Sequence, residues 1–135
     1  MYENILYEIT DGVARITLNR PQVYNALSPG LLKDITAAIH ATATDDSVRV
    51  VVITGAGEKA FCSGADLKEG MGEATSLGES LRQNYNPMIL AIRNLPKPVI
   101  CRLNGVAAGA GCSLALSCDL TIASKEHAVF KQTDP

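Results

Sequence analysis

Three glycines lie close together in the stretch NGVAAGAGCSLALSCD, residues 104–119, at Gly105, Gly109 and Gly111. The residues that follow are mostly apolar, and the stretch contains no histidine and no acid before Asp119. One source of chemistry in such a stretch is the backbone, because N–H groups at the start of a helix can face an anion. Small residues also let two elements pack closely. The pattern alone leaves both roles open.

A second segment repeats this order of features. VVVITGAGEKAFCSGADL at 50–67 and VICRLNGVAAGAGCSLAL at 99–116 each combine an apolar strand, a glycine-containing turn and a helix start. Two helix starts that meet would offer a pair of N–H donors to a developing oxyanion. Close packing is the commoner reason for such glycines. Neither loop has the Gly-Lys-Ser/Thr of a phosphate loop, or a GxGxxG followed by an acid, which argues against a nucleotide-binding domain.

Strands and helices alternate along the chain, which predicts an α/β domain with a largely parallel sheet. An Asp-Gly turn at 11–12 predicts a hairpin between the first two strands, and Ser28-Pro29 predicts a helix start. A helix is predicted from Ser76 to about residue 95, with Tyr85 on its inner, apolar face. Because this helix contains Pro87, it is either kinked or divided in two. The predicted strands are 2–9, 13–18, 48–55, 99–103 and 120–124, and the other predicted helices are 29–43 and 110–117.

Composition narrows the class of protein. The chain is 47% hydrophobic and 19% charged with a net charge of −2, as expected of a single globular domain that binds neither nucleic acid nor membranes. His40 and His127 are isolated, which favours ordinary, partly exposed histidines. The cysteines have no metal-site spacing and are expected to be reduced and buried in a cytoplasmic protein. They are Cys62, Cys101, Cys112 and Cys118.

Four ordered segments carry a family resemblance. ITLNRPQVYNAL, VVVITGAGEKAFCSGADL, KPVICRLNGVAAGAGCSLALSCDLTIAS and AVFKQ together resemble the enoyl-CoA hydratase/isomerase, or crotonase, superfamily. Residues 84–111 are similar in particular to ring-epoxide isomerases of the phenylacetate pathway. The resemblance implies a crotonase-like spiral of β-β-α units, with 1–135 as the N-terminal part of one such domain and the C-terminal half absent. Such a truncated domain would expose apolar surface, which self-association could cover.

The resemblance also implies a site. It places the two oxyanion donors at the backbone N–H groups of Ala65 and Ala110, where they would hold a thioester oxygen and stabilise an enolate. The segment 68–78 would border the acyl pocket. The substrate is an acyl-CoA, with no separate cofactor or metal, and the family forms trimers or hexamers. The implied substrate-binding residues are Asn25, Ala26, Ser63, Gly64, Asp66, Leu67 and Gly109.

Several of these residues have a second interpretation. Asp66 could instead cap the following helix, and Arg20 is either a contact to a CoA phosphate or a solvated surface residue. Asp119 is expected to be a structural hydrogen-bonding residue. Asp134 falls where the family has a glutamate, but we interpret this as a coincidence so close to the end of the sequence.

One departure from the family pattern affects the reaction. Hydratases of the family have a glutamate at the position of Ser113, and a serine hydroxyl cannot act as a carboxylate base near neutral pH. The sequence therefore favours an isomerase-like enzyme over a hydratase, with a general base that it does not identify. The alternative is a catalytically silent chain that binds acyl-CoA or serves in assembly.

Overall fold

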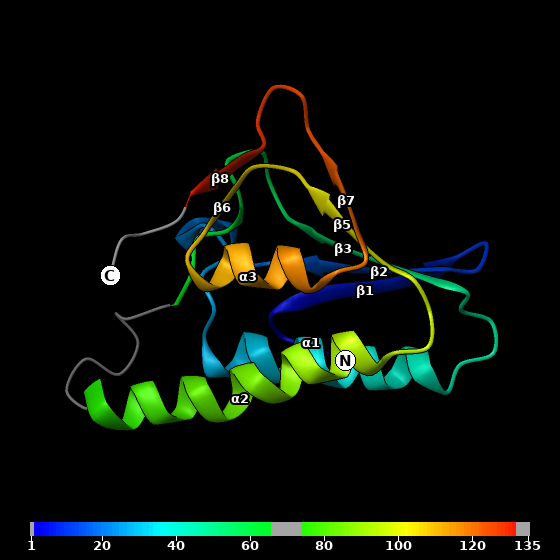
Figure 1. Ribbon diagram of the computed structural model, residues 1–135, viewed down its shortest axis with the longest axis horizontal. Helices are drawn as coiled ribbons and strands as arrows, with labels where there is room; N and C mark the ends of the chain where they lie inside the picture. Colours follow the sequence, from blue (N-terminus) through cyan, green and yellow to red (C-terminus); the bar gives the residue numbers. More distant parts are fainter. Residues whose placement is uncertain (1, 66–73, 132–135) are drawn as a thin grey trace.

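The computed structural model describes residues 2–65 and 74–131, and for residues 74–78 it describes the backbone only. Two sheets and three α-helices make up this part of the chain (Figure 1). The strands are β1 (Ile5–Thr10), β2 (Val13–Leu18), β3 (Val50–Gly55), β4 (Ala60–Cys62), β5 (Val99–Leu103), β6 (Val106–Ala108), β7 (Leu120–Ala123) and β8 (Val129–Lys131). The helices are the 3-10 helix η1 (Pro21–Val23) and the α-helices α1 (Pro29–Ala43), α2 (Ala74–Asn94) and α3 (Ala110–Ser117).

The larger sheet has the strand order β1-β2-β3-β5-β7. Only β1 and β2 are antiparallel, and the remaining pairs are parallel, so the predicted mostly parallel sheet is confirmed. The hairpin between β1 and β2 turns at Asp11 and Gly12, which have φ of 53° and 82°. Two residues with positive φ match the twist that a tight hairpin requires. All five strands that the sequence predicts lie in this sheet.

A smaller parallel sheet of β4, β6 and β8 was not predicted from the sequence. Each of its strands is three residues long, too short to show a period of two. The strands also pair across long sequence separations, which local patterns do not report. This sheet matters for the site, because β4 and β6 lead directly into the two glycine-containing loops.

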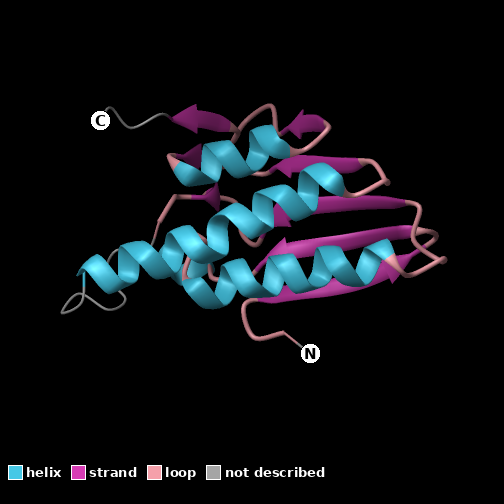
Figure 2. Cartoon of the chain, turned by 60° about the horizontal axis from the view of Figure 1, so that its bottom comes forward, coloured by secondary structure: helices cyan, strands magenta, loops and turns pink. Residues whose placement is uncertain are grey.

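Helices α1 and α2 lie side by side over one face of the larger sheet (Figure 2). Helix α1 begins as predicted, because the Ser28 Oγ accepts a hydrogen bond of 3.2 Å from the Leu31 N–H and Pro29 occupies the first turn. Helix α2 begins at Ala74, two residues before the predicted start, and continues through Pro87 as one helix. Of the two alternatives that the sequence left open at Pro87, the single helix is therefore the one that the structure shows.

The core lies between these helices and the larger sheet, and it is built from aliphatic residues of β2, β3, β5 and α1. The end of the molecule formed by α3, β7 and β8 exposes apolar side chains instead of burying them. Five large apolar side chains there are between 46% and 64% exposed, which is typical of a surface that contacts other protein. These are Leu116, Leu120, Ile122, Val129 and Phe130.

Candidate functional site

Both residues predicted to donate to an oxyanion follow a glycine in an unusual backbone conformation. Gly64, before Ala65, has a φ of 107°. Gly109, before Ala110, has a φ of 53° and stands as the N-cap of α3, with no side-chain cap. An L-residue with a side chain adopts such positive φ values only with strain, so glycine is required for the backbone to turn at these two points.

Other glycines allow the loops to approach each other. A Cβ atom on Gly111 would lie 2.2 Å from the Cys62 carbonyl oxygen, and one on Gly105 would lie 2.7 Å from the Ala60 nitrogen. Both distances are impossible for real atoms, so these glycines serve close packing between α3 or β6 and the segment at β4. Close packing is therefore the role of Gly105 and Gly111, while Gly64 and Gly109 shape the backbone before Ala65 and Ala110.

The two loops meet at one apolar cavity of about 240 Å³. A Cβ atom on Gly64 would stand only 3.9 Å from the Ala110 nitrogen, which shows how near the second loop is. Within the described part of the chain, neither the Ala65 N–H nor the Ala110 N–H donates to a protein acceptor. The residues that line the cavity are Leu27, Leu32, Ala65, Leu81, Arg82, Tyr85 and Ala110.

Tyr85 brings a polar atom from α2 to this cavity. Its hydroxyl donates a hydrogen bond of 3.4 Å to the Ala110 carbonyl oxygen. Burial raises the pKa of Tyr85, and a hydrogen bond with the Ser113 side chain opposes part of that increase. The phenol is therefore neutral at physiological pH and acts as a donor.

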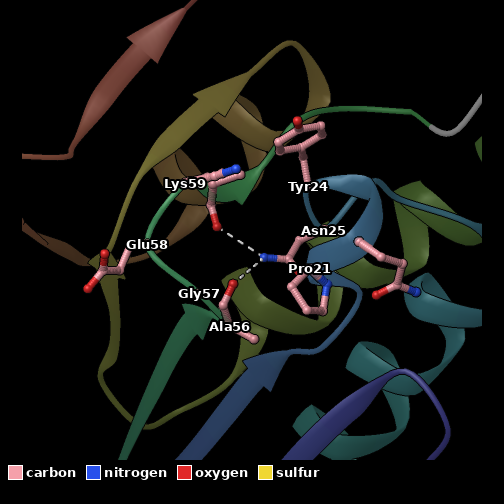
Figure 3. Close-up of a pocket in the computed structure, with 9 residues that line it drawn as sticks. Pro21, Tyr24, Asn25, Ala56, Gly57, Glu58 and Lys59 are labelled. Atoms are coloured by element: carbon pink, nitrogen blue, oxygen red, sulfur yellow. Dashed lines mark hydrogen bonds between the residues drawn. The ribbon is translucent and has the colours of Figure 1, made fainter.

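A second cavity, of about 470 Å³, lies beside the segment 21–25 (Figure 3). Tyr24 and Asn25 both have a φ of 56°, so this segment turns sharply between η1 and α1. It runs next to the loop after β4, because the Ser63 N–H donates to the Tyr24 carbonyl at 3.1 Å and the Leu27 N–H donates to the Gly64 carbonyl at 2.7 Å. The larger cavity lies between the segment 21–25 and the turn 56–60, whereas the smaller one is lined by Leu27 and Ala65 further along the same two stretches of chain. Among the described residues, Tyr24, Glu58 and Lys59 line the larger one.

Asn25 holds this region together. Its side chain is fully buried, and its amide nitrogen donates to the carbonyls of Ala56 and Ala60 at 3.1 Å and 3.0 Å (Figure 3). Its amide oxygen accepts from the Arg20 N–H at 2.8 Å. Asn104 also donates to the Ala60 carbonyl, at 3.0 Å, and accepts from the Gly55 N–H. Two asparagines, one from each half of the site, therefore fix the turn between β3 and β4.

Replacing Asn25 with alanine should destabilise the protein by about 3 kcal/mol, because buried backbone groups lose their partners. Chemical unfolding in urea would measure the loss. Asn25→Asp, which keeps the acceptor for the Arg20 N–H, provides the comparison and should also destabilise, because it loses both donated bonds. An Asn25→Ala protein as stable as the wild type would show that these bonds do not hold the turn.

The other predicted site residues are placed as follows. Ala26 is buried beside Asn25, and its carbonyl accepts a hydrogen bond from the Arg20 guanidinium, while Ser63 is exposed on the loop after β4. Asp66 and Leu67, most of the segment 68–78 and Asp134 lie outside the described residues. Asp119 is structural, as expected, because its carboxylate accepts a hydrogen bond of 2.8 Å from the Val99 N–H.

The cysteines take no part in the polar chemistry of the site. Cys62, Cys101 and Cys112 are buried as predicted, and Cys118 is partly buried. Burial raises the pKa of the Cys62 thiol to about 12, in spite of a hydrogen bond from the Gly64 backbone. A thiol that stays protonated is a poor nucleophile. Among the described residues, no group of three potential ligands is arranged to hold a metal ion.

Sequence reasoning missed three contributors to the site. It did not assign Leu27 or Leu32 to the cavity, since their spacing indicates only a loop and a helix. It placed Tyr85 on the inner face of α2 without linking it to Ala110. The position of Tyr85 in the sequence did indicate such a contact, because the hydroxyl of a buried tyrosine usually finds a hydrogen-bond partner.

Taken together, the geometry defines an α/β domain in which two glycine-containing loops meet at an apolar cavity lined by Ala65 and Ala110. Comparison with known proteins identifies the family to which this domain belongs. The family model for enoyl-CoA hydratase/isomerase matches residues 8–135. The chain therefore belongs to the enoyl-CoA hydratase/isomerase family, and the sequence resemblance is confirmed.

Individual relatives support the same assignment. The chain is 46% identical over 131 residues to a probable enoyl-CoA hydratase of Rhodobacter capsulatus, covering 97% of this chain and 49% of that one. It is 41% identical over 129 residues to the 1,2-epoxyphenylacetyl-CoA isomerase of Escherichia coli K12, covering 93% and 49%. The chain thus spans about half the length of these curated relatives.

Solved structures show the same fold. A crystal structure of an enoyl-CoA hydratase/isomerase from Xanthobacter autotrophicus Py2 matches with a TM-score of 0.89 and 40% identity, over 98% of this chain and 49% of that one. An enoyl-CoA hydratase from Bacillus anthracis matches with a TM-score of 0.86 and 39% identity, over 97% and 51%. The crotonase-like fold is therefore established. Among the described residues, no helix is both long and apolar enough to cross a membrane.

Proposed function

We propose that this chain supplies an acyl-CoA site in which the N–H groups of Ala65 and Ala110 hold the thioester oxygen. When a base removes the proton at Cα, the electron pair forms a carbon–carbon double bond and negative charge moves to that oxygen. Two preorganised donors stabilise this enolate, and losing one typically costs about 3–4 kcal/mol. The observation that carries the proposal is the common cavity that both alanines line.

The acyl group would occupy the smaller cavity, where leucines and the Tyr85 ring surround the donors. The coenzyme would run along the paired segments 24–27 and 63–65, close to Ala26, Ser63, Gly64 and Gly109. Asn25 would contribute through the shape of the turn, because its amide is already committed to backbone groups. Contacts from Asp66 and Leu67 remain part of the proposal.

The reaction we propose is isomerase-like. A base removes a proton from Cα, and a proton is then added at another carbon of the acyl group. Hydration by a pair of glutamates is disfavoured, because Ser113 stands where the resemblance places the first of them. None of the described residues that line the smaller cavity carries a carboxylate. The general base therefore has to come from another part of the protein.

The lack of a carboxylate among the described residues that line the smaller cavity favours a second candidate. This candidate is a chain that binds acyl-CoA without catalysing a reaction on it. Proton exchange separates the two. Phenylacetyl-CoA is a suitable probe, because a relative acts on a phenylacetyl-CoA derivative and the Cα protons of phenylacetyl-CoA are easily followed. The protein, in its natural full length, would be incubated with the probe in D₂O, with deuterium uptake measured by mass spectrometry and binding by calorimetry.

We expect binding together with uptake at Cα well above the rate without protein. Binding without uptake would favour the silent acyl-CoA-binding chain. Absence of binding by both phenylacetyl-CoA and a short alkyl probe such as butyryl-CoA would contradict both candidates.

A further inference from the structure

Helix α3 begins without the usual support. It is only eight residues long, and its N-cap is Gly109, which provides no side-chain hydrogen bond. The Gly109 carbonyl accepts from the N–H groups of Cys112 and Ser113 at 3.0 Å and 3.2 Å, which closes the first turn internally. A short helix without a capping side chain depends on packing to hold its first turn in one direction.

Tyr85 supplies that packing from α2, a helix of 21 residues. Its hydroxyl donates to the Ala110 carbonyl at 3.4 Å, and Ser113 lies near enough to lower the pKa of that hydroxyl. Ala110 and Ser113 are three residues apart and therefore share one face of the helix. The Tyr85 hydroxyl thus holds the first turn of α3 at the Ala110 carbonyl, on the face that also carries Ser113, while the ring forms part of the cavity wall.

The direction of the Ala110 N–H depends on how this first turn is held. The amide lies one peptide unit before the carbonyl that Tyr85 contacts, so a rotation of the turn would move both groups together. A misplacement of about 1 Å at a reacting centre can cost about 100-fold in rate. Even a smaller rotation would weaken a donor that must meet a developing charge.

We propose that Tyr85 is a positioning residue that fixes the direction of the Ala110 N–H by holding the Ala110 carbonyl; this inference rests on the proposed oxyanion function. Tyr85 does not itself touch the thioester oxygen. Its hydroxyl orients the donor, and its ring contributes only to the cavity wall.

The test is the variant Tyr85→Phe, which keeps the ring and removes the hydroxyl. With phenylacetyl-CoA in D₂O, we expect the saturated rate of Cα exchange to fall about 10-fold, with little change in the half-saturating concentration. Tyr2→Phe is the matched control, because the Tyr2 ring packs on Tyr7 in β1, away from the cavity, and its rate should equal the wild-type rate.

The decisive step combines this variant with Ala110→Pro, which removes the donor itself. If Tyr85 acts through the Ala110 N–H, its hydroxyl has nothing left to orient in that background, and Tyr85→Phe should cause no further loss. Ser113→Ala should cause a smaller loss than Tyr85→Phe, because it leaves the bond between the Tyr85 hydroxyl and the Ala110 carbonyl in place. Thermal unfolding of each variant would establish that the folded proteins are being compared.

Three results would overturn the inference. Tyr85→Phe could exchange at the wild-type rate, it could change only the half-saturating concentration, or it could slow Ala110→Pro by a further 10-fold. In the last case the proposed function would stand and only the role of Tyr85 would fail. If Ala110→Pro alone exchanged at the wild-type rate, the proposed function itself would fail.

Discussion

Replacing Ala110 with proline is expected to slow Cα exchange in bound phenylacetyl-CoA by about 100- to 1000-fold, the usual cost of losing one oxyanion donor. Proline lacks the N–H group and is otherwise suited to this position. Ala110 is the first residue of α3, where proline is favoured and where the missing N–H breaks no intrahelical bond. The substitution therefore removes the proposed donor while keeping the helix.

Two measurements control for other effects of the proline. Ala110→Gly keeps the N–H and should lose far less activity than Ala110→Pro. Thermal unfolding of the proline variant should remain close to that of the wild type, and exchange rates should be compared at saturating phenylacetyl-CoA, because the proline Cδ takes the place of the amide hydrogen beside the thioester oxygen. A folded, substrate-binding Ala110→Pro protein with the wild-type exchange rate would mean that this N–H is not a catalytic donor.

Replacing Gly111 with alanine is expected to produce the largest loss of stability, more than about 3 kcal/mol. The new Cβ atom would lie 2.2 Å from the Cys62 carbonyl oxygen and 2.8 Å from the Cys62 carbonyl carbon. Both are backbone atoms of β4, which cannot move aside without disturbing the smaller sheet. Overpacking against a well-packed interior usually costs about 1–3 kcal/mol, and a rigid neighbour places this site at or above the upper end.

Gly30→Ala provides a matched control. Gly30 is also the second residue of its helix, α1, so both variants gain the same helix propensity of about 1 kcal/mol. Its Cβ atom would meet the Asn4 side-chain amide at 2.9 Å, a flexible group rather than backbone. Urea unfolding should show a small effect at Gly30 and a large one at Gly111. Equal effects would contradict the close approach of α3 to β4.

Much of the fold follows from local sequence. The strand 13–18 and the helices 29–43 and 110–117 coincide with β2, α1 and α3, because their boundaries carry strong signals such as Asp-Gly and Ser-Pro. The smaller sheet could not be predicted in this way. Its three-residue strands exist because glycine lets β6 approach the segment before β4, and that contact joins residues about 45 positions apart in the sequence.

The candidate site was predictable in outline and less so in detail. The two glycine-containing loops left close packing and backbone donors both open, and the family resemblance singled out Ala65 and Ala110, which do line one cavity. The side-chain roles were harder to predict. Asn25 was expected to contact the coenzyme, and its amide is occupied by three backbone groups. Tyr85 was expected to pack in the interior, yet its hydroxyl reaches α3. Both roles depend on segments that only tertiary structure brings together.

The most direct measurement is the infrared stretching frequency of the thioester carbonyl in bound phenylacetyl-CoA, identified by a ¹³C label at that carbon. If the N–H groups of Ala65 and Ala110 hold the oxygen, the band should move to lower frequency on binding, and the shift should shrink in Ala110→Pro. A bound thioester whose band matches that of free phenylacetyl-CoA in water, in both proteins, would contradict the proposed oxyanion site.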